Sequence, residues 1–424
     1  MSEYFFNPEF VSSDWVADKS VIKVIGVGGG GCNAVTYMYN QGIEGCCFIV
    51  CNTDSQALVK STVPLKIQLG EEGLGAGTDP TKARAAAMES QDVIVEKVLD
   101  SSTKMLFITA GMGGGTGTGA SPVIASLAKE RGILTVAVVT LPFLNEGQSF
   151  LSKAMEGIFE LRKYVDSLLI INNEKLYEHF GNLLVHEALP KADDVLATAV
   201  RGIVDIISRP GYMNVDFEDV RTMMKNSGMA LMGCGTGRGK DRVKEAVTGA
   251  MESSLLDDFD PRTARNLLVN VTISHDKESI TMEELNEVKS RILEYTGSVD
   301  KSKMGIVYDD SPDFKDKVSV TVIATGFKLD MSRFTGAETG KFIFIKKDFR
   351  YDTSIRGGTD EDGVIELHNP EVNITTVGLN SGNNIPKFRF AQNEVPVLSS
   401  ESGIPRLELD SQPAIRRKSR VQLS

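Results

Sequence analysis

Short apolar runs alternate with helical patterns along the first half of the chain, and this alternation most narrows the folds that the chain can adopt. Five such runs lie between Val21 and about Ile171, with the sequences VIKVIGV, CCFIVCN, MLFITAG, LTVAVVTL and SLLIIN. Such runs are typical of strands buried on both faces, and helices between them are typical of crossovers that join parallel strands. The pattern predicts an α/β fold with a doubly wound parallel sheet of the nucleotide-binding type.

The remaining sequence predicts a linking helix, a second domain and a tail. Ala192–Ser208 has apolar residues at helical spacing and ends before Arg-Pro-Gly, which indicates a single central helix. A smaller mixed region follows to about Phe327, with strand patterns in NLLVNVTIS, MGIVY and KVSVTVIATGF, and we expect it to have its own sheet. The later residues are polar and lack periodicity, which is typical of disorder. The predicted parts are an N-terminal extension (1–20), a nucleotide-binding domain (21–191), the central helix (192–210), a second domain (211–327) and a disordered tail (328–424).

Charge and hydropathy exclude several classes of partner. The 424 residues carry a formal net charge of -11, whereas proteins that bind nucleic acid present basic surfaces. The first residues, MSEYFFNPEF, are acidic where a secretory signal begins with positive charge. No apolar run reaches the roughly 18 residues that span a bilayer. We therefore expect a cytoplasmic protein that does not bind nucleic acid.

Two glycine-rich segments each connect a predicted strand to a predicted helix. GVGGGGCNAV fits the weak dinucleotide pattern GxGxxG, and Asp54 ends the next strand, where dehydrogenases have a ribose-binding acid. TAGMGGGTGTGASP, residues 109–122, has six glycines between Gly111 and Gly119 but no lysine, so it is not the P-loop pattern GxxxxGK[ST]. Two such turns in one sheet predict two contacts with phosphate groups.

Bare backbone at these turns suits an anionic ligand. Glycine lets an N–H group approach an anion unobstructed, and a helix N-terminus adds about half a positive charge. The expected ligand is a polyphosphate, to which Thr116 and Thr118 can add hydroxyl donors. Because the loop has no lysine, backbone amides and Mg²⁺ are expected to neutralise the phosphates.

The combined motifs GGGTGTG, the earlier NTD and the later NVDFEDV resemble the FtsZ family, bacterial tubulin homologues that hydrolyse GTP and polymerise for cell division. The resemblance covers about Val21 to Phe327. It implies a tubulin-like fold, in which a parallel-sheet GTPase domain is joined by a long central helix to a smaller mixed-sheet domain. It also implies GTP and GDP as ligands, assembly of the chain with itself into a head-to-tail filament, and localisation in the cytoplasm at the division site.

The resemblance assigns nucleotide-binding roles to residues in several loops. The first phosphate and base loop, the ribose loop and the terminal-phosphate loop would contribute Gly29, Gly30, Gly31, Cys32, Asn33, Asp54, Ala76 and Gly77. The second glycine loop would contribute Gly113, Gly114, Gly115, Thr116, Gly117, Thr118 and Gly119. The sugar and guanine contacts would come from Thr140, Glu146, Asn173 and Asp193. A carboxylate suits guanine because it accepts hydrogen bonds from two adjacent donors, which adenine does not present.

Three places depart from the family pattern. Phe150 replaces an arginine that usually contacts the nucleotide, so a cationic contact is lost or supplied elsewhere. Leu189 replaces a phenylalanine that usually stacks on the base, which predicts weaker affinity or base discrimination. Thr78 and Asp79 replace alanine and asparagine, and Asp79, followed by Pro80, also has the position of a helix N-cap.

The segment NVDFEDV provides the residues that the resemblance makes catalytic, which are Asn214, Asp216 and Asp219. Such groups can polarise a water or hold a cation, but only within reach of the terminal phosphate. They follow the central helix, away from both glycine loops, and no metal site is assigned to protein side chains alone. The resemblance implies that this loop enters the next subunit's nucleotide site, so that hydrolysis occurs only in a filament. The alternative is that the acids cap a helix and face solvent.

The end of the chain, LELDSQPAIRRKSRVQLS, turns basic after Pro413 and is similar to the family's docking peptide, with spacing shifted by about one residue. This implies division adaptor proteins as partners and only indirect contact with the membrane; a merely solvated terminus is the alternative.

Two rival functions of the whole chain also stay open. A nicotinamide-dependent dehydrogenase explains the first glycine loop and Asp54 but not the second loop. A nucleotide-binding polymer with little hydrolysis explains Phe150 and Leu189 but not the acids Asp216 and Asp219.

Overall fold

The computed structural model describes residues 20–175, 182–209, 211–213, 215–252, 261–274, 279–309, 311, 314, 316–327, 343–344 and 375–376. The chain divides into two units, Met1–Leu329 and Asp330–Ser424. In the second unit, the described strands β12 (Ile343–Phe344) and β13 (Thr375–Thr376) pair antiparallel. Residues 1–19 and the predicted docking peptide lie outside the described residues. Within the described part of the chain, we find no helix that has the length and apolar character needed to cross a bilayer.

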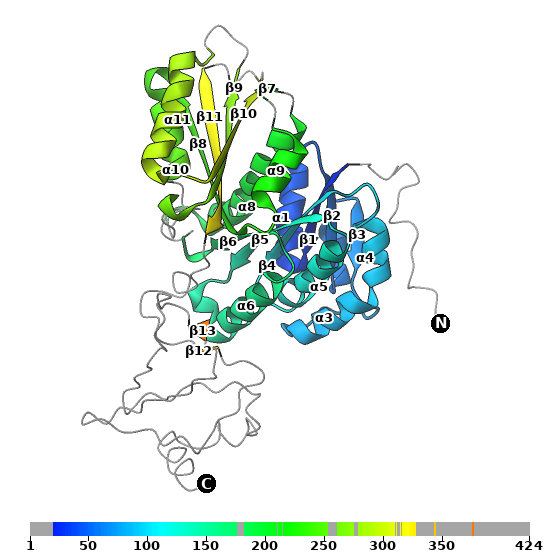
Figure 1. The fold of residues 1–424 in the computed structure, drawn as a ribbon. Coiled ribbons are helices and arrows are strands. Elements are labelled where there is room, and N and C mark those ends of the chain that lie inside the picture. The colour runs from blue at the N-terminus through cyan, green and yellow to red at the C-terminus, as the bar shows by residue number, and fades with distance from the viewer. Residues whose placement is uncertain are drawn as a thin grey trace, which may run out of the picture. The chain divides into compact units, whose positions relative to one another are not determined.

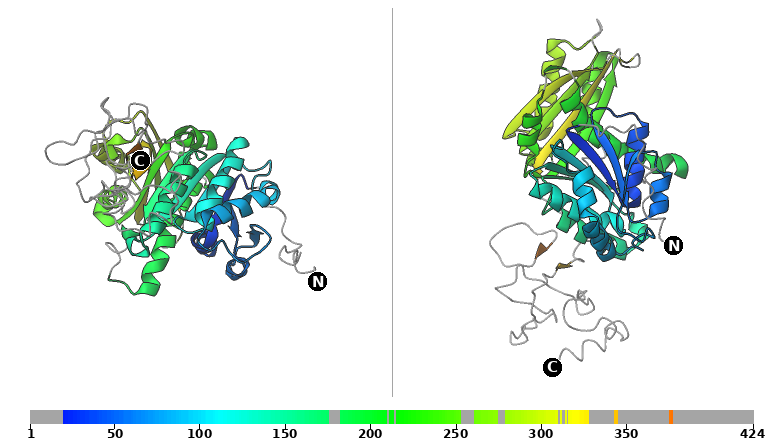
Figure 2. Two further views of the ribbon diagram at one scale, coloured as in Figure 1. Left: turned by 90° about the horizontal axis from the view of Figure 1, so that it is seen from below. Right: turned by 90° about the vertical axis from the view of Figure 1, so that its right-hand side faces the viewer.

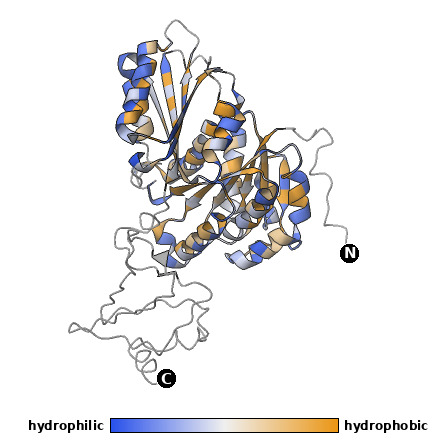
Figure 3. Ribbon diagram, viewed as in Figure 1, coloured by the Kyte–Doolittle hydropathy of each residue, from blue (hydrophilic) through white to orange (hydrophobic). Residues whose placement is uncertain are grey.

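The first unit is built on one sheet of eleven strands in the order β3-β2-β1-β4-β5-β6-β8-β11-β9-β10-β7 (Figure 1). The first six of these strands run parallel, which confirms the predicted fold class. They are β1 (Ile22–Val27), β2 (Cys47–Asn52), β3 (Leu65–Gln68), β4 (Met105–Gly111), β5 (Leu134–Leu141) and β6 (Ser167–Asn172). Their apolar residues give this part of the sheet its orange colour in Figure 3, as expected for strands that are buried on both faces.

Helices cover both faces of the parallel strands (Figure 2). They are α1 (Gly28–Asn40), α2 (Ser55–Lys60), α3 (Pro80–Glu89), α4 (Gln91–Lys97), α5 (Thr116–Glu130) and α6 (Gln148–Leu161), and a short 3₁₀ turn, η2 (Leu144–Glu146), precedes α6. As predicted, Asp79 caps α3 by accepting from the Thr81 N–H, and Pro80 takes the first helical position. Helices α3, α5 and α6 pack together on one face, whereas α1 lies on the other.

The central helix α8 (Val185–Ser208) packs on the same face as α1 and shares its hydrophobic core. It begins earlier than the predicted start at Ala192 and includes Pro190. A proline near a helix start removes one intrahelical hydrogen bond, and here the long apolar stripe compensates by burying Leu196, Val200 and Ile203. The predicted end at Ser208 is correct.

The second domain continues the sheet instead of having its own, contrary to the prediction. Its strands are β7 (Gly211–Met213), β8 (Gly228–Arg238), β9 (Asn266–Ile273), β10 (Lys301–Tyr308) and β11 (Lys317–Phe327), and its helices are α9 (Phe217–Met224), α10 (Arg242–Met251) and α11 (Met282–Thr296), with 3₁₀ turns η3 (Gly239–Asp241) and η4 (Pro261–Thr263). Strand β8 pairs with β6 through Ser167–Gly228 and Leu168–Met229. The Ser167 hydroxyl also donates to the Met224 carbonyl at 2.8 Å, so the junction is polar and buried.

Candidate functional site

The two glycine loops meet at one edge of the sheet. Strands β1 and β4 are parallel neighbours, so their carboxyl ends lie side by side. Helix α1 begins at Gly28, directly after β1, and α5 begins at Thr116, shortly after β4. The positive ends of both helices and their free N–H groups are therefore brought to the same place, as expected for a phosphate site.

Several of the glycines are required because backbone packs against backbone. A Cβ added at Gly31 would lie 2.2 Å from the Thr109 carbonyl oxygen, and one at Gly117 would lie 2.4 Å from that of Gly111. At Gly119 the distance to the Pro80 carbonyl oxygen would be 2.0 Å. These glycines bring the two loops and the start of α3 into close contact, so their role is in the structure of the site.

Gly29 and Gly114 are different, because an added Cβ at either would meet no described atom within 4 Å. Neither residue has a positive φ angle, so backbone conformation does not require glycine there. Gly29 is exposed and lines the pocket described next. Open space beside an unobstructed N–H group is the arrangement that an anionic ligand needs.

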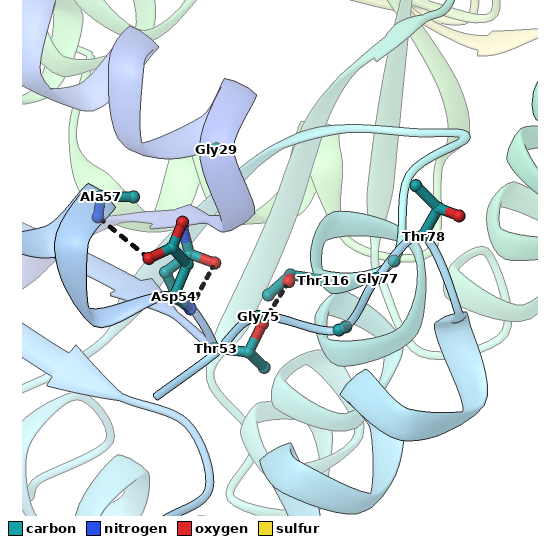
Figure 4. Close-up of a pocket in the computed structure, with 11 residues that line it drawn as sticks. Gly29, Thr53, Asp54, Ala57, Gly75, Gly77, Thr78 and Thr116 are labelled. Carbon is teal, nitrogen blue, oxygen red and sulfur yellow. Dashed lines mark hydrogen bonds between the residues drawn. The ribbon is translucent and has the colours of Figure 1, made fainter. Parts of the chain in front are cut away.

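A cavity of about 230 Å³ lies at this edge of the sheet (Figure 4). Its lining comes from four segments and comprises Gly29, Asn52, Thr53, Asp54, Ala57, Gly75, Ala76, Gly77, Thr78, Gly115 and Thr116. The hydroxyls of Thr53 and Thr116 are 2.7 Å apart and join the segment after β2 to the start of α5. The lining thus offers hydroxyls and backbone amides, with Asp54 as its one carboxylate.

Asp54 has a structural role as well as a place in the pocket. Its carboxylate accepts from the N–H groups of Gln56 and Ala57 and so caps α2. Its backbone pairs with that of Leu74, which brings the segment 75–78 to the pocket. The predicted residues Ala76 and Gly77 lie in this segment and line the pocket.

Two of the predicted residues have side chains that turn away from the pocket. Thr118 was expected to offer a hydroxyl to the ligand, but it is buried and does not line the pocket. Its hydroxyl instead accepts from the Gly113 N–H at 2.9 Å and so fixes the loop. The Cys32 thiol lies 3.4 Å from the Cys51 carbonyl oxygen and 3.7 Å from that of Gly26. Burial raises the pKa of Cys32 to about 12, which keeps the thiol neutral.

The predicted base contacts lie on α1 (Asn33), directly after β6 (Asn173) and on α8 (Asp193). Asn33 is exposed on α1, and one turn further the Tyr37 hydroxyl donates to the Asp194 carboxylate at 3.1 Å, which ties α1 to α8. Beside this contact, burial raises the pKa of Asp193 to about 6. The Asn173 Oδ1 is buried without a hydrogen-bond partner among the described residues. The Asn173 Oδ1 is therefore available for a ligand.

The predicted sugar contacts are ordered by local structure. Thr140 is buried near the end of β5, and its carbonyl accepts from the Met112 N–H at 2.9 Å. The Glu146 carboxylate accepts from the Phe143 N–H at 2.9 Å and so closes the short turn before α6. These bonds fix the segment that follows β5.

The predicted catalytic acids lie on the second domain. Asp216 caps α9, and its Oδ1 accepts from the Asp219 N–H at 2.7 Å. The Asp219 carboxylate pairs with the Lys303 ammonium at 2.9 Å. Asn214 lies outside the described residues, and the side chain of Leu189 is likewise not described. Neither acid lines the pocket, so nothing in the described chain brings the acids and the pocket together.

Sequence reasoning gave no site role to five residues that line the pocket, Asn52, Thr53, Ala57, Gly75 and Thr78, or to the neighbouring Lys153. Asn52 and Thr78 line the pocket, and the Lys153 ammonium donates to the Thr78 carbonyl at 2.8 Å. The NTD motif that begins at Asn52 was the available signal for that residue, whereas Lys153 comes from α6 and has no motif. Among the described residues, no group of three or more His, Cys, Asp or Glu side chains is arranged to hold a metal ion.

Comparison with known proteins gives consistent matches along most of the chain. The family model for the GTPase domain of the Tubulin/FtsZ family matches residues 21–181, and that for the FtsZ family C-terminal domain matches residues 228–328. The chain is 50% identical over 317 residues to the cell division protein FtsZ of Pseudomonas putida, which covers 74% of this chain and 78% of the relative. It is 49% identical over 309 residues to the Coxiella burnetii protein of the same name, covering 72% and 78% respectively.

Solved structures agree with these matches. An FtsZ dimer from M. jannaschii has 40% sequence identity and a TM-score of 0.66, and the match covers 72% of this chain and 88% of that one. CetZ1 from Haloferax volcanii has only 18% identity but a TM-score of 0.62 over 74% of this chain and 96% of that one, so it shares the fold.

Proposed function

The chain belongs to the tubulin/FtsZ family of GTPases, and from this premise we propose that it is a cell-division protein that assembles head to tail and hydrolyses GTP between its subunits. Family membership removes the dehydrogenase alternative, which explained only the first glycine loop. One observation supports the proposal most strongly. The acids Asp216 and Asp219 lie on the second domain and do not line the pocket formed at the glycine loops of the same chain.

GTP would bind with its phosphates over the two helix N-termini. The open N–H groups near Gly29 and Gly114, together with the Thr53 and Thr116 hydroxyls, suit phosphate oxygens. The guanine would lie toward Asn173, whose buried Oδ1 has no hydrogen-bond partner among the described residues, and toward Asp193, whose pKa is raised by burial. An ionised Asp193 can accept from two adjacent guanine donors.

Mg²⁺ fits this site as a companion of the nucleotide. The pocket has hydroxyls and one carboxylate, Asp54, but the described residues have no three-acid cluster for a dedicated cation site. Mg²⁺ commonly binds through substrate phosphates and retains several waters, which is compatible with such a lining. When bound, it would neutralise phosphate charge, and the hydroxyls of Thr53 and Thr116 would be available to hold it.

Hydrolysis would require a second subunit. Asp216 and Asp219 carry the carboxylates that can polarise a water, but neither lines the pocket of its own chain. A head-to-tail contact that brings this loop to the pocket of the next copy repeats without closing and produces a filament. The active site would then exist only at subunit contacts.

Recruitment to the division site is proposed from the sequence of the tail. The basic segment after Pro413 is similar to the family's docking peptide and would bind division adaptor proteins, so that membrane contact is indirect. Deleting the residues after Leu407 should abolish recruitment and leave GTP turnover unchanged. Altered turnover in the truncated protein would contradict a separate docking role.

The central test is to measure phosphate release per protein molecule over a range of protein concentrations with Mg²⁺, while recording light scattering. A threshold concentration shared by turnover and scattering would support a site assembled between subunits. Turnover proportional to concentration from the lowest dose would refute it in favour of a self-contained site. Scattering without turnover would instead support the polymer with little hydrolysis.

A further inference from the structure

The pocket lacks a cationic side chain in its lining, although its proposed ligand carries several negative charges. Phe150 cannot supply the charge, because it is an aromatic residue. The side chain that brings positive charge to the pocket is Lys153, whose ammonium donates to the carbonyl of the pocket-lining residue Thr78 at 2.8 Å.

Helix α6, which carries this ammonium, packs against the second glycine loop. An added Cβ at Gly113 would lie 2.9 Å from the Phe150 carbonyl oxygen, so the first turn of α6 packs directly against that loop. Lys153 is nearly one turn further along α6, and its Nζ lies 5.7 Å from the centre of the Phe150 ring. The same helix thus contacts the glycine loop through the Phe150 backbone and the Thr78 turn through the Lys153 ammonium.

The Thr78 turn lines the pocket on the side away from Asp54 (Figure 4). Figure 4 shows Thr78 and Asp54 on opposite sides of Thr53 and Thr116. Thr78 also has a φ of 62°, a left-handed conformation that a β-branched residue rarely adopts. Contacts such as that with Lys153 hold the turn in this disfavoured conformation.

The bonding of Lys153 leaves capacity for a ligand. An ammonium has three N–H donors, and the described residues offer it one hydrogen-bond acceptor, the Thr78 carbonyl. A phosphate oxygen is a stronger acceptor for an ammonium than a neutral carbonyl, because both partners are charged. The flexible side chain can therefore reach toward a phosphate without a change in the fold.

We propose that Lys153 is a phosphate-binding residue that supplies positive charge to the terminal phosphate of GTP, in place of the cation that Phe150 cannot provide. This inference rests on the proposed binding of GTP in the pocket. Because only GTP has this terminal phosphate, Lys153 should strengthen the binding of the triphosphate more than that of the diphosphate.

The test compares the affinities of the full chain for GDP and for the β,γ-methylene analogue of GTP, measured by isothermal titration calorimetry below the assembly threshold. Lys153→Met removes the charge, and Lys153→Arg retains it. Lys129→Met is the matched control, because Lys129 on α5 also donates to a backbone carbonyl, that of Lys163 at 2.6 Å, but Lys163 does not line the pocket.

We expect Lys153→Met to weaken binding of the GTP analogue about tenfold or more, as for the loss of a charge-assisted hydrogen bond, and to change GDP affinity much less. Lys153→Arg and Lys129→Met should retain the preference of the wild type. Equal weakening for both nucleotides would overturn the proposal and assign Lys153 only to holding the Thr78 turn, and no weakening would overturn it as well. If the wild type bound neither nucleotide, GTP binding itself, and not this inference alone, would fail.

Discussion

Replacing Gly29 with alanine should stabilise the free protein and weaken its binding of GTP. Gly29 lies in α1, has no positive φ, and an added Cβ would meet no described atom within 4 Å. Alanine at such a helical position is more stable than glycine by about 0.5–1 kcal/mol. For a unit of this size, that gain corresponds to a rise in melting temperature of about 1–4 °C.

The same methyl group should obstruct the ligand. It would stand where a phosphate oxygen approaches the backbone N–H groups at the start of α1. A lost hydrogen bond to a charged group costs about 1.5–3 kcal/mol, which is roughly a tenfold to hundredfold loss of affinity. One substitution is therefore expected to move stability and binding in opposite directions.

Gly117→Ala is the matched control, since its Cβ would lie 2.4 Å from the Gly111 carbonyl oxygen. Such overpacking costs about 1–3 kcal/mol, so this variant should unfold at a lower temperature than the wild type. Thermal unfolding would be measured without nucleotide by circular dichroism, and binding of a non-hydrolysable GTP analogue by calorimetry. If Gly29→Ala bound the analogue as tightly as the wild type, or unfolded at a lower temperature, the distinction between open and packed glycines would be refuted.

Three further predictions concern carboxylates. Asp216→Asn should retain the cap of α9 and the melting temperature but lose phosphate release above the assembly threshold. Asp216→Ala should lose phosphate release and also about 1 kcal/mol of folding stability. Normal turnover in the asparagine variant would contradict a catalytic role. Burial raises the pKa of Asp193 to about 6, so this carboxylate becomes protonated as the pH drops from 7 to 5, and the GTP affinity measured by calorimetry should fall. Asp193→Asn should remove this pH dependence. A dependence that survives in the variant would exclude Asp193 as its source. Burial also raises the pKa of Asp100, but hydrogen bonds from Lys23 and Ser102 outweigh it and bring the pKa to about 2, below the ordinary value of 3.8. This carboxylate should stabilise the fold above pH 3.8 and lose that effect as the pH falls toward 2, so Asp100→Asn should lower the melting temperature at pH 7 and have little effect near pH 2.

The parallel half of the fold could be predicted because its strands are continuous apolar runs. Strand β8 could not, since GMALMGCGTGR contains four glycines and resembles a loop by propensity. Its glycines are explained by tertiary contact: added Cβ atoms at Gly235 and Gly237 would lie 2.1 and 2.0 Å from the carbonyl oxygens of Ala246 and Arg242 on α10. The close packing of α10 on β8 depends on contacts within the folded structure, so it cannot be predicted from the local sequence pattern of the strand.

The location of the candidate site could be predicted from the two strand-to-helix turns, but the role of each residue could not. Gly29 in the first glycine segment and Gly117 in the second were both assigned to nucleotide binding, yet one faces open space and the other has a carbonyl oxygen 2.4 Å from its added Cβ. Thr118 was expected to contact the ligand because hydroxyls suit phosphates, but the fold uses its hydroxyl to hold Gly113. Lys153 contacts the pocket-lining residue Thr78 only because α6 folds back against the second glycine loop.

Capping and catalysis, the two roles weighed for Asp216, are compatible in the structure. A carboxylate has two acceptor oxygens, and the cap of α9 uses Oδ1. The Oδ2 atom has no hydrogen-bond partner among the described residues, and the cap orients it. Both oxygens of Asp219, by contrast, lie 2.9 Å from the Lys303 ammonium. In the proposed head-to-tail contact, Asp216 would therefore be the better placed of the two acids to polarise a water, and Asp219 would first have to be released from Lys303.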